Sequence, residues 1–297
     1  GQRQMCIRDS LWTVGKRYLN EKEFKRERTL EQPFTPYAAD LEIQKDKTYY
    51  RVLDLTQSTL NSNRCAYFHK SIGGYSAAKI RRFQDLWDWH LMDDLRAGKI
   101  TDNGIFNMLN MKYYIYPNQQ AAEPRYGINT NANGNAWIVN KINVVENADS
   151  AILQLPKIDT KSQAIVEKEY VDLISNNSVF DSTANIVLSS YHPEKLEYKY
   201  TSKTENNVAF SEVFYDKGWN AYIDNQPVDH FRLNYILRGL KVPAGEHNIR
   251  FEFNPKTYQT GSILAVTFGS FIYLIIGLSI FLWIRKELIT KDPNNRG

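Results

Sequence analysis

The 297-residue chain has little cysteine, little net charge and no familiar catalytic motif. Its two cysteines, Cys6 and Cys65, are too few for the disulfide framework of a small secreted protein. Lysine and arginine number 37 against 33 aspartate and glutamate, and a net charge of +4 is too small to indicate a nucleic-acid-binding protein. The sequence contains no GxSxG, HExxH or P-loop motif, so these hydrolase, metalloprotease and nucleotide-binding sites are not predicted.

The mean hydropathy of −0.50 conceals one long uncharged run near the C-terminus. No charged residue occurs from Thr257 to Ile284, and the inner part, 262–284, is predominantly apolar. A membrane-spanning helix needs roughly 20 such residues to cross about 30 Å of hydrocarbon, whereas buried core helices rarely extend this far without a charge. Tyr258 and Trp283 suit the two membrane interfaces. We therefore predict a transmembrane helix at 262–284.

The residues that follow, 285–297, predict the orientation of this helix. They contain four basic residues and two acidic ones, and basic residues beside a span mark the cytoplasmic side. We expect 285–297 to be a cytoplasmic tail, and everything before 257 to be extracytoplasmic. The expected location is the inner (cytoplasmic) membrane, with membrane lipid as a partner.

The first ten residues have an unusual composition. Residues 2–10, QRQMCIRDS, match the translation of a sequencing-library adapter, so we expect 1–10 to be foreign to the protein. No basic and apolar signal sequence precedes Leu11. An outward-facing region needs a route across the membrane, so we expect N-terminal transmembrane helices of the same protein to have preceded this chain.

Between these ends the chain divides by pattern. Residues 11–40 are polar, mixed in charge and interrupted by prolines, which predicts a solvated connector. Residues 41–175 are predicted to be an α/β extracytoplasmic segment, with a strand at 49–55. Apolar residues at helical spacing predict a helix from Ser76, as its N-cap, to Arg96.

From residue 185 short β-like runs alternate with turn sequences. This spacing predicts an antiparallel β-sandwich over 176–256, in which Ile249, Phe251 and Phe253 alternate onto the buried face. The predicted fold class is an α+β outward-facing region with a C-terminal antiparallel β-sandwich, followed by one transmembrane α-helix.

Few residues of the sequence point to chemistry. The cluster weighed as metal ligands is His69, His90, Asp93 and Asp94. His90 and Asp94 share a helical face as ligands could, but His69 lies well upstream and an exposed helix face explains the cluster better, so we assign no metal site. Cys65 lacks a basic surrounding and is expected to be a small packed residue. Among the aromatic residues of the sandwich, Trp219 and Tyr222 are candidates for stacking on sugars, against the alternative that strands bury such rings.

Seven phrases of the sequence carry a family resemblance. They are LWTVGKRYLN (11–20), YRVLDL (50–55), FHKSIGGYSAAKIRRFQDLWDWHL (68–91), MLNMKYYI (108–115), GNAWIV (134–139), FSEVFYDKGWNAYID (210–224) and NYILRGLKVPAGEHNIRFEFNP (234–255). In order, they resemble the C-terminal region of the bacterial YfhO-like membrane protein family, particularly its Bacteroidetes members.

This resemblance implies a multi-pass protein of GT-C-type glycosyltransferase architecture. Such a protein would use a lipid-linked sugar donor to glycosylate a cell-envelope glycan, and no other cofactor is implied. The catalytic acidic residue of GT-C enzymes lies in an early outward loop between N-terminal helices, so no residue of this chain inherits a catalytic role. The alternative is a non-catalytic, membrane-anchored carbohydrate-binding or structural module of the envelope.

Within this picture, one turn is the best candidate for contact with a phosphate or sugar. Gly74 and Tyr75 offer backbone donors, and Lys79 and Arg82 offer positive charge at the start of the predicted helix. The alternative is a tight turn that leads into a well-capped helix.

Overall fold

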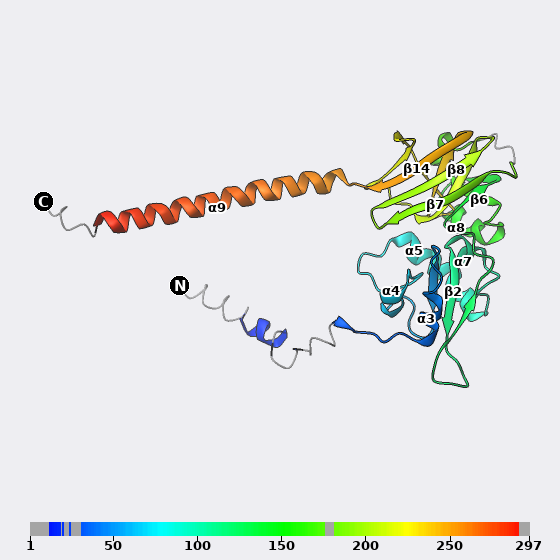
Figure 1. Cartoon of the computed structure of the whole chain (residues 1–297), viewed down its shortest axis with the longest axis horizontal. Helices are drawn as coiled ribbons and strands as arrows, with labels where there is room; N and C mark the ends of the chain where they lie inside the picture. The colour runs from blue at the N-terminus through cyan, green and yellow to red at the C-terminus, as the bar shows by residue number, and fades with distance from the viewer. Residues whose placement is uncertain (1–11, 19, 21–23, 25–30, 176–180, 291–297) are drawn as a thin grey trace. The chain divides into compact units, whose positions relative to one another are not determined.

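The computed structural model describes residues 12–18, 20, 24, 31–175 and 181–290. The chain forms two compact units, which are described separately: 1–84 with 92–132, and 85–91 with 133–297. Figure 1 labels some of the elements of each unit. The predicted adapter segment, 1–10, and most of the predicted cytoplasmic tail lie outside the described residues.

The first unit is built around a three-stranded sheet of order β1-β2-β3. Strand β1 pairs in parallel with β2, and β2 pairs antiparallel with β3. The elements of this unit are α3 (Ala38–Ile43), β1 (Arg51–Asp54), α4 (Arg64–Phe68), most of α5 (Arg81–Leu86), α6 (Met92–Arg96), α7 (Gly104–Met108), β2 (Met111–Tyr116) and β3 (Arg125–Ile128).

Alternation in β2 places one row of side chains in the core of the first unit. Met111, Tyr113 and Ile115 are buried, whereas the residues between them are only half-buried. Tyr113 and Ile115 pack with Ile43 of α3 and Val52 of β1 in one apolar cluster. Helix α3, β1 and β2 are therefore held together by burial of apolar surface.

The strand predicted at 49–55 is confirmed as β1, but the long helix predicted from Ser76 is only partly confirmed. The helix begins at Arg81, and the Ser76 hydroxyl instead accepts a hydrogen bond from the Ala78 N–H, so Ser76 is not the N-cap. After α5 the chain makes a π-helical turn, η2 (Trp87–Leu91), before α6 continues to Arg96. Gly98 follows with φ of +72°, as expected of a glycine beyond a helix end.

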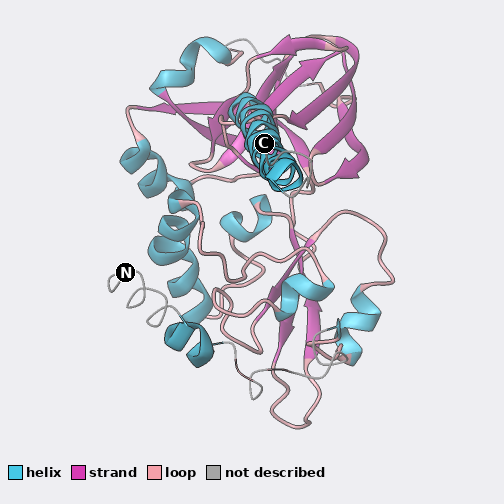
Figure 2. Ribbon diagram, turned by 90° about the vertical axis from the view of Figure 1, so that its left-hand side faces the viewer, coloured by secondary structure: helices cyan, strands magenta, loops and turns pink. Residues whose placement is uncertain are grey.

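The second unit contains two further sheets. The five-stranded sheet has the order β11-β10-β14-β8-β7, and the six-stranded sheet has the order β4-β9-β13-β12-β6-β5. Figure 2 shows their curved strands in magenta. The strands are β4 (Ala136–Val139), β5 (Lys141–Val145), β6 (Gln163–Glu167), β7 (Asn185–His192), β8 (Lys195–Ser202), β9 (Asn206–Val213), β10 (Trp219–Ile223), β11 (Gln226–Val228), β12 (Phe231–Leu233), β13 (Leu237–Val242) and β14 (Gly245–Phe253). The helices are η2, α8 (Ala148–Gln154), η3 (Leu155–Lys157), η4 (Lys168–Leu173) and α9 (Lys256–Thr290).

The two sheets pack face to face, which confirms the predicted antiparallel β-sandwich. Phe210 of the six-stranded sheet lies 4.8 Å, between ring centroids, from Tyr198 and 4.9 Å from Phe251, both of the five-stranded sheet. The alternation predicted in β14 holds for Ile249 and Phe251, which are 1% and 0% exposed. It fails at the strand end, where Phe253 is 39% exposed and packs beside Trp219.

The six-stranded sheet also includes strands that precede residue 176, where the sandwich was expected to start. Strands β5 and β6 pair in parallel, and Val166 of β6 pairs with Leu233 of β12. Strand β4 pairs with β9. The sheets therefore draw on the chain from Ala136 onward.

Helix α9 contains the whole run predicted to cross the membrane. It is the candidate membrane span among the described residues, extending from Lys256 to Lys286, and its apolar side chains are exposed on all sides. Within it, Thr267 and Ser279 each donate a hydroxyl hydrogen bond of 2.8 Å to a carbonyl one turn earlier. These polar side chains are therefore satisfied without water, as hydrocarbon requires.

Candidate functional site

The turn that includes Gly74 and Tyr75 lies against the loop that follows β1. The Gly74 N–H donates to the Thr59 carbonyl at 2.7 Å, and the Tyr75 N–H donates to Asn63 Oδ1 at 2.8 Å. A Cβ on the preceding Gly73 would lie 2.0 Å from the Thr59 carbonyl oxygen, so this close approach requires glycine. The backbone donors proposed for a phosphate or sugar are thus hydrogen-bonded within the chain.

The two basic candidates of this region are separated by the helix start. Lys79 precedes α5 and donates to Gln84 Oε1 at 3.4 Å. Arg82 lies in the first turn of α5 and is half-buried. The two charges therefore lie on either side of the start of the helical run formed by α5, η2 and α6, and their contact with an anion stays a prediction.

The two aromatic candidates lie on opposite faces of β10. Trp219 is half-buried at the margin of the sandwich core, where the Arg238 guanidinium lies 4.3 Å from its ring. Tyr222 faces outward, and its ring lies 4.1 Å from the guanidinium of Arg250 on β14. Both rings are half-buried, and each has a guanidinium against it, so stacking of a sugar on either stays a prediction.

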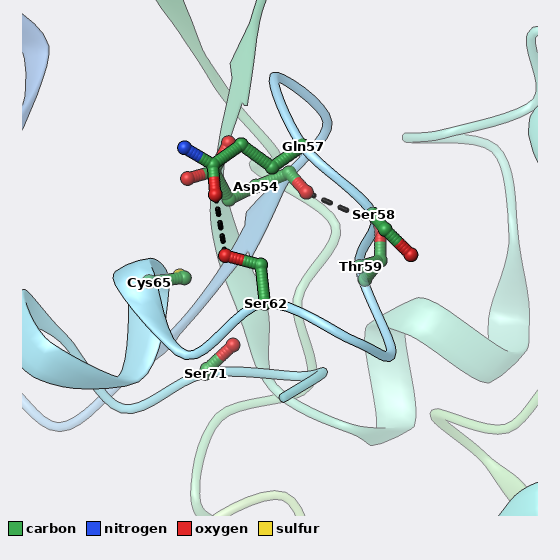
Figure 3. A pocket seen from close by; sticks show the side chains of 7 residues that line it. All are labelled: Asp54, Gln57, Ser58, Thr59, Ser62, Cys65 and Ser71. Carbon is green, nitrogen blue, oxygen red and sulfur yellow. Dashed lines mark hydrogen bonds between the residues drawn. The ribbon is translucent and has the colours of Figure 1, made fainter. Parts of the chain in front are cut away.

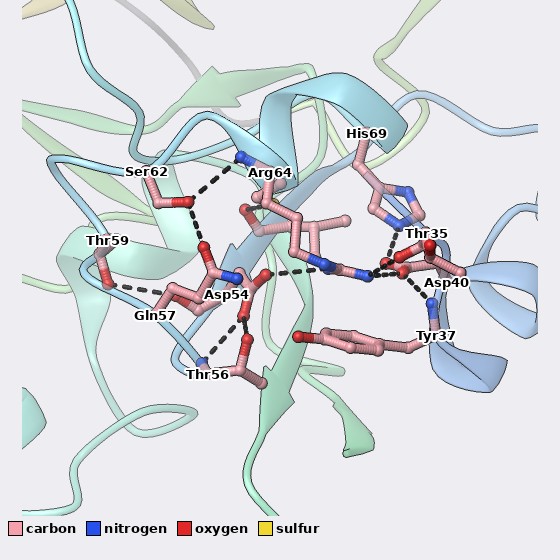
Figure 4. A network of polar contacts seen from close by, with 12 residues as sticks. Thr35, Tyr37, Asp40, Asp54, Thr56, Gln57, Thr59, Ser62, Arg64 and His69 are labelled. Atoms are coloured by element: carbon pink, nitrogen blue, oxygen red, sulfur yellow. Dashed lines mark hydrogen bonds and ion pairs between the residues drawn. The ribbon is translucent and has the colours of Figure 1, made fainter. Parts of the chain in front are cut away.

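The residue after Asn63, which accepts the Tyr75 N–H, is Arg64, and a buried charge network is centred on it. This arginine opens α4, and its side chain is 3% exposed. Its Nη2 donates to Asp40 Oδ2, and its Nη1 donates to Asp54 Oδ2 at 3.2 Å. The guanidinium also lies 3.4 Å from the ring centroid of Tyr37, as Figure 4 shows. One cation thus joins α3, the end of β1 and α4.

Each carboxylate in this network has further donors. Asp40 accepts from the Tyr37 N–H at 2.7 Å and from His69 Nε2 at 2.9 Å. Asp54 accepts from the N–H and the hydroxyl of Thr56 at 2.9 and 2.6 Å. Because a carboxylate only accepts, the Nε2 of His69 carries a proton.

The network holds Asp40 in its charged form. Burial acts to raise the pKa of Asp40, but the hydrogen bonds from His69, Arg64 and the Tyr37 backbone outweigh burial and keep this pKa below its ordinary value. A carboxylate held ionised by fixed donors is a poor general acid. The arrangement is therefore suited to fixing the loop of 55–63 rather than to proton transfer.

A small polar cavity lies beside the network, between this loop and the start of the turn. Asp54 and Cys65 line it together with the hydroxyl and amide groups shown in Figure 3, and it has room for about one water molecule. Burial raises the pKa of the Cys65 thiol to about 12, and the thiol lies 3.6 Å from the Val52 carbonyl. Cys65 is therefore the packed residue that was predicted, and it is no nucleophile at neutral pH.

The residues weighed as metal ligands have other partners. His69 binds Asp40, and His90 Nε2 lies 2.8 Å from the Ile152 carbonyl. Asp94 accepts from the Asn103 side chain. Among the described residues no group of three or more His, Cys, Asp or Glu side chains could hold a metal ion.

Sequence reasoning missed the Arg64 network. Asp40, Asp54 and Arg64 are single charges within or beside apolar segments, and this is the one signal that could have marked them for burial. This signal does not show which charges are partners, because Arg64 lies 10 positions from Asp54 and 24 positions from Asp40 in the sequence.

Comparison with known families identifies the second unit. Residues 176–265 match the family model described as bacterial membrane protein YfhO. Over these residues the chain is similar to that family. The match covers strands β7 to β14 and the first part of α9. No curated protein and no solved structure matches this chain.

Replacement of Arg64 tests whether the network organises the first unit. In Arg64→Ala, Asp40 and Asp54 remain buried without their cation, and we expect a loss of about 3–5 kcal/mol of local stability, measured by hydrogen exchange of β1 and α4. Lys45→Ala, which removes an exposed ion pair with Glu42, should cost less than about 1 kcal/mol. Equal losses of stability in the two variants would contradict the conclusion that the Arg64 network organises the first unit.

The lowered pKa of Asp40 predicts the sign of acid sensitivity. Its contribution to stability is complete above pH about 4, the ordinary aspartate value, and is lost as the pH falls through the lowered folded-state value. Asp40→Asn should therefore lose less stability than the parent chain between pH about 5 and about 2, measured by thermal unfolding. Asp93→Asn, at an exposed position, should keep the parent profile. Parallel profiles for Asp40→Asn and the parent would refute this assignment.

Proposed function

We propose that this chain is the C-terminal extracytoplasmic module and last membrane helix of a multi-pass YfhO-like glycosyltransferase of the cell envelope. The enzyme would take its sugar from a lipid-linked donor, and its catalytic acidic residue would lie in an early outward loop between N-terminal transmembrane helices outside this chain. The observation that carries the proposal is the YfhO match, which continues from the last sandwich strand into the candidate span.

The junction between β14 and α9 supports a place at the membrane surface. Only Asn254 and Pro255 separate Phe253, the last residue of β14, from Lys256, the first residue of α9. Two residues reach at most about 7 Å, so the sandwich must stay close to the bilayer face at which α9 begins. A module tethered this closely is suited to positioning an envelope glycan near a lipid-linked donor in the same membrane.

Charge at the other end of α9 supports the proposed orientation. Arg285 and Lys286 immediately follow the uncharged run, and this favours the cytoplasm for that end. The two units would then face the outside of the inner membrane, which is where a lipid-linked sugar would be used.

The alternative, a non-catalytic binding or structural module of the envelope, is favoured by one observation. The carboxylates of the Arg64 network are already engaged by its guanidinium and by fixed donors, and burial keeps Cys65 protonated. These observations favour a non-catalytic role for the chain, either as part of the glycosyltransferase or as a separate envelope module.

Deletion and complementation of the complete gene would test the proposal. We expect deletion to remove a sugar substituent from an envelope polymer, detected by mass spectrometry of the purified polymer. The complete gene, and the complete gene with Lys45→Ala, should restore it, whereas 12–297 alone should not. An unchanged envelope glycan composition after deletion would refute the glycosyltransferase proposal.

A further inference from the structure

We propose that the outward face of the five-stranded sheet carries a binding groove for a neutral oligosaccharide. The proposed function suggests a glycan as the ligand class, whereas the position of the groove and its preference for an uncharged chain rest on the geometry. The groove has a volume of about 580 Å³, within the range of small-ligand sites. It is lined by outward side chains of β8 and β14, by Ser189 of β7, and by the hairpin tip Asp224–Asn225.

The floor of the groove is set by strand register. Asn248 of β14 pairs with Lys199 of β8, and two residues along Arg250 pairs with Glu197. These four side chains point outward, because the alternate residues Tyr198, Ile249 and Phe251 are buried in the sandwich core. β14 and β8 lie side by side in Figure 1, so the polar groups share one rigid surface.

The wall of the groove is held by the hairpin between β10 and β11. Asp224 and Asn225 both have positive φ, +50° and +66°, as a tight two-residue hairpin turn requires. The Asp224 carboxylate accepts the Asn248 N–H at 2.9 Å and lies 2.6 Å from His247 Nδ1. The hairpin tip is therefore tied to β14, and the groove is formed before any ligand arrives.

Charge in the groove is balanced by neighbouring pairs. Lys195 lies 2.6 Å from Glu197, and Arg250 forms an ion pair with Glu252 while its guanidinium rests on the Tyr222 ring. The negative charge of Asp224 offsets the positive charge of Lys199, which lines the same groove. Paired charges leave no strong field of one sign, so a polyanion would gain little from binding here.

The same side chains are well suited to hydroxyl groups. Carboxylate, guanidinium and amide groups offer fixed pairs of acceptors or donors, and charged groups make the stronger hydrogen bonds. Asn248 and Lys199 are exposed in the groove and add donors and an acceptor. A neutral sugar chain, which both donates and accepts at each hydroxyl, matches this mixture better than an anion does.

Titration calorimetry of the whole chain in lipid nanodiscs tests the groove, since maltoside detergents would themselves present sugars. The probes are maltohexaose, cellohexaose and chitohexaose as neutral chains, and a hexamer of galacturonic acid as the acidic one. We expect at least one neutral probe to bind, with an affinity that changes little between about 0.05 and about 0.5 M NaCl. Binding confined to the acidic probe, or absent for all the neutral ones, would overturn the proposal.

Variants locate the site. The double substitution Lys199→Ala/Asn248→Ala should weaken binding about tenfold or more, the effect of losing about one hydrogen bond to a charged group. Thr201→Ala/Glu246→Ala changes the neighbouring exposed pair on the same two strands outside the groove, and should leave the affinity unchanged. Equal effects of the two double variants would overturn the assignment of the groove.

The experiments distinguish failure of the groove proposal from failure of the glycosyltransferase proposal. Oligosaccharide binding together with an unchanged envelope in the deletion strain would leave the groove standing and remove the glycosyltransferase. Loss of envelope glycosylation on deletion, with no binding of neutral probes, would support the glycosyltransferase and overturn the groove.

Discussion

The absence of charge from Thr257 to Ile284 is the constraint on which the rest of this molecule depends. In hydrocarbon a single segment can satisfy its backbone groups only as a helix, so this run forms the continuous α9. Because β14 ends two residues before α9 begins, the helix also fixes where the sandwich can lie. The polar exterior and apolar interior of the sandwich are those of a domain in water, attached at the edge of a bilayer.

The two units are stabilised in different ways. The sandwich is held by aromatic packing between its sheets, where Tyr198, Phe210 and Phe251 meet. The first unit has a smaller sheet and places a buried ion network around Arg64 beside its apolar cluster. Such a network contributes little net stability but is costly to break, so it favours one arrangement of α3, β1 and α4. The turn at Gly73–Tyr75 hydrogen-bonds to Thr59 and Asn63 of the loop beside that network, and its contact with a ligand stays a prediction.

Features carried by local pattern were predictable from the sequence. The uncharged run predicted the membrane helix, and alternation in β14 identified Ile249 and Phe251 as core residues. Features that depend on partners distant in the sequence could not be predicted.

The six-stranded sheet joins β6 to β12 across about 67 residues, where Val166 pairs with Leu233. The Arg64 network joins three elements through single charged residues. The helical run begins at Arg81 rather than Ser76, and it takes π-helical geometry at Trp87–Leu91 although its periodicity looked uniform. At the candidate site, Tyr222 was recognisable as a strand aromatic, but its pairing with Arg250 depends on strand register.

The central claim is that the two units face away from the cytoplasm, with the C-terminus inside. It is tested most directly by paired reporters fused after Gly297 of the complete protein in a bacterial inner membrane. Alkaline phosphatase, which is active only outside the cytoplasm, should be inactive there, whereas a cytoplasmic fluorescent protein should fluoresce. Active phosphatase with a dark fluorescent reporter would place the sandwich in the cytoplasm and contradict the account.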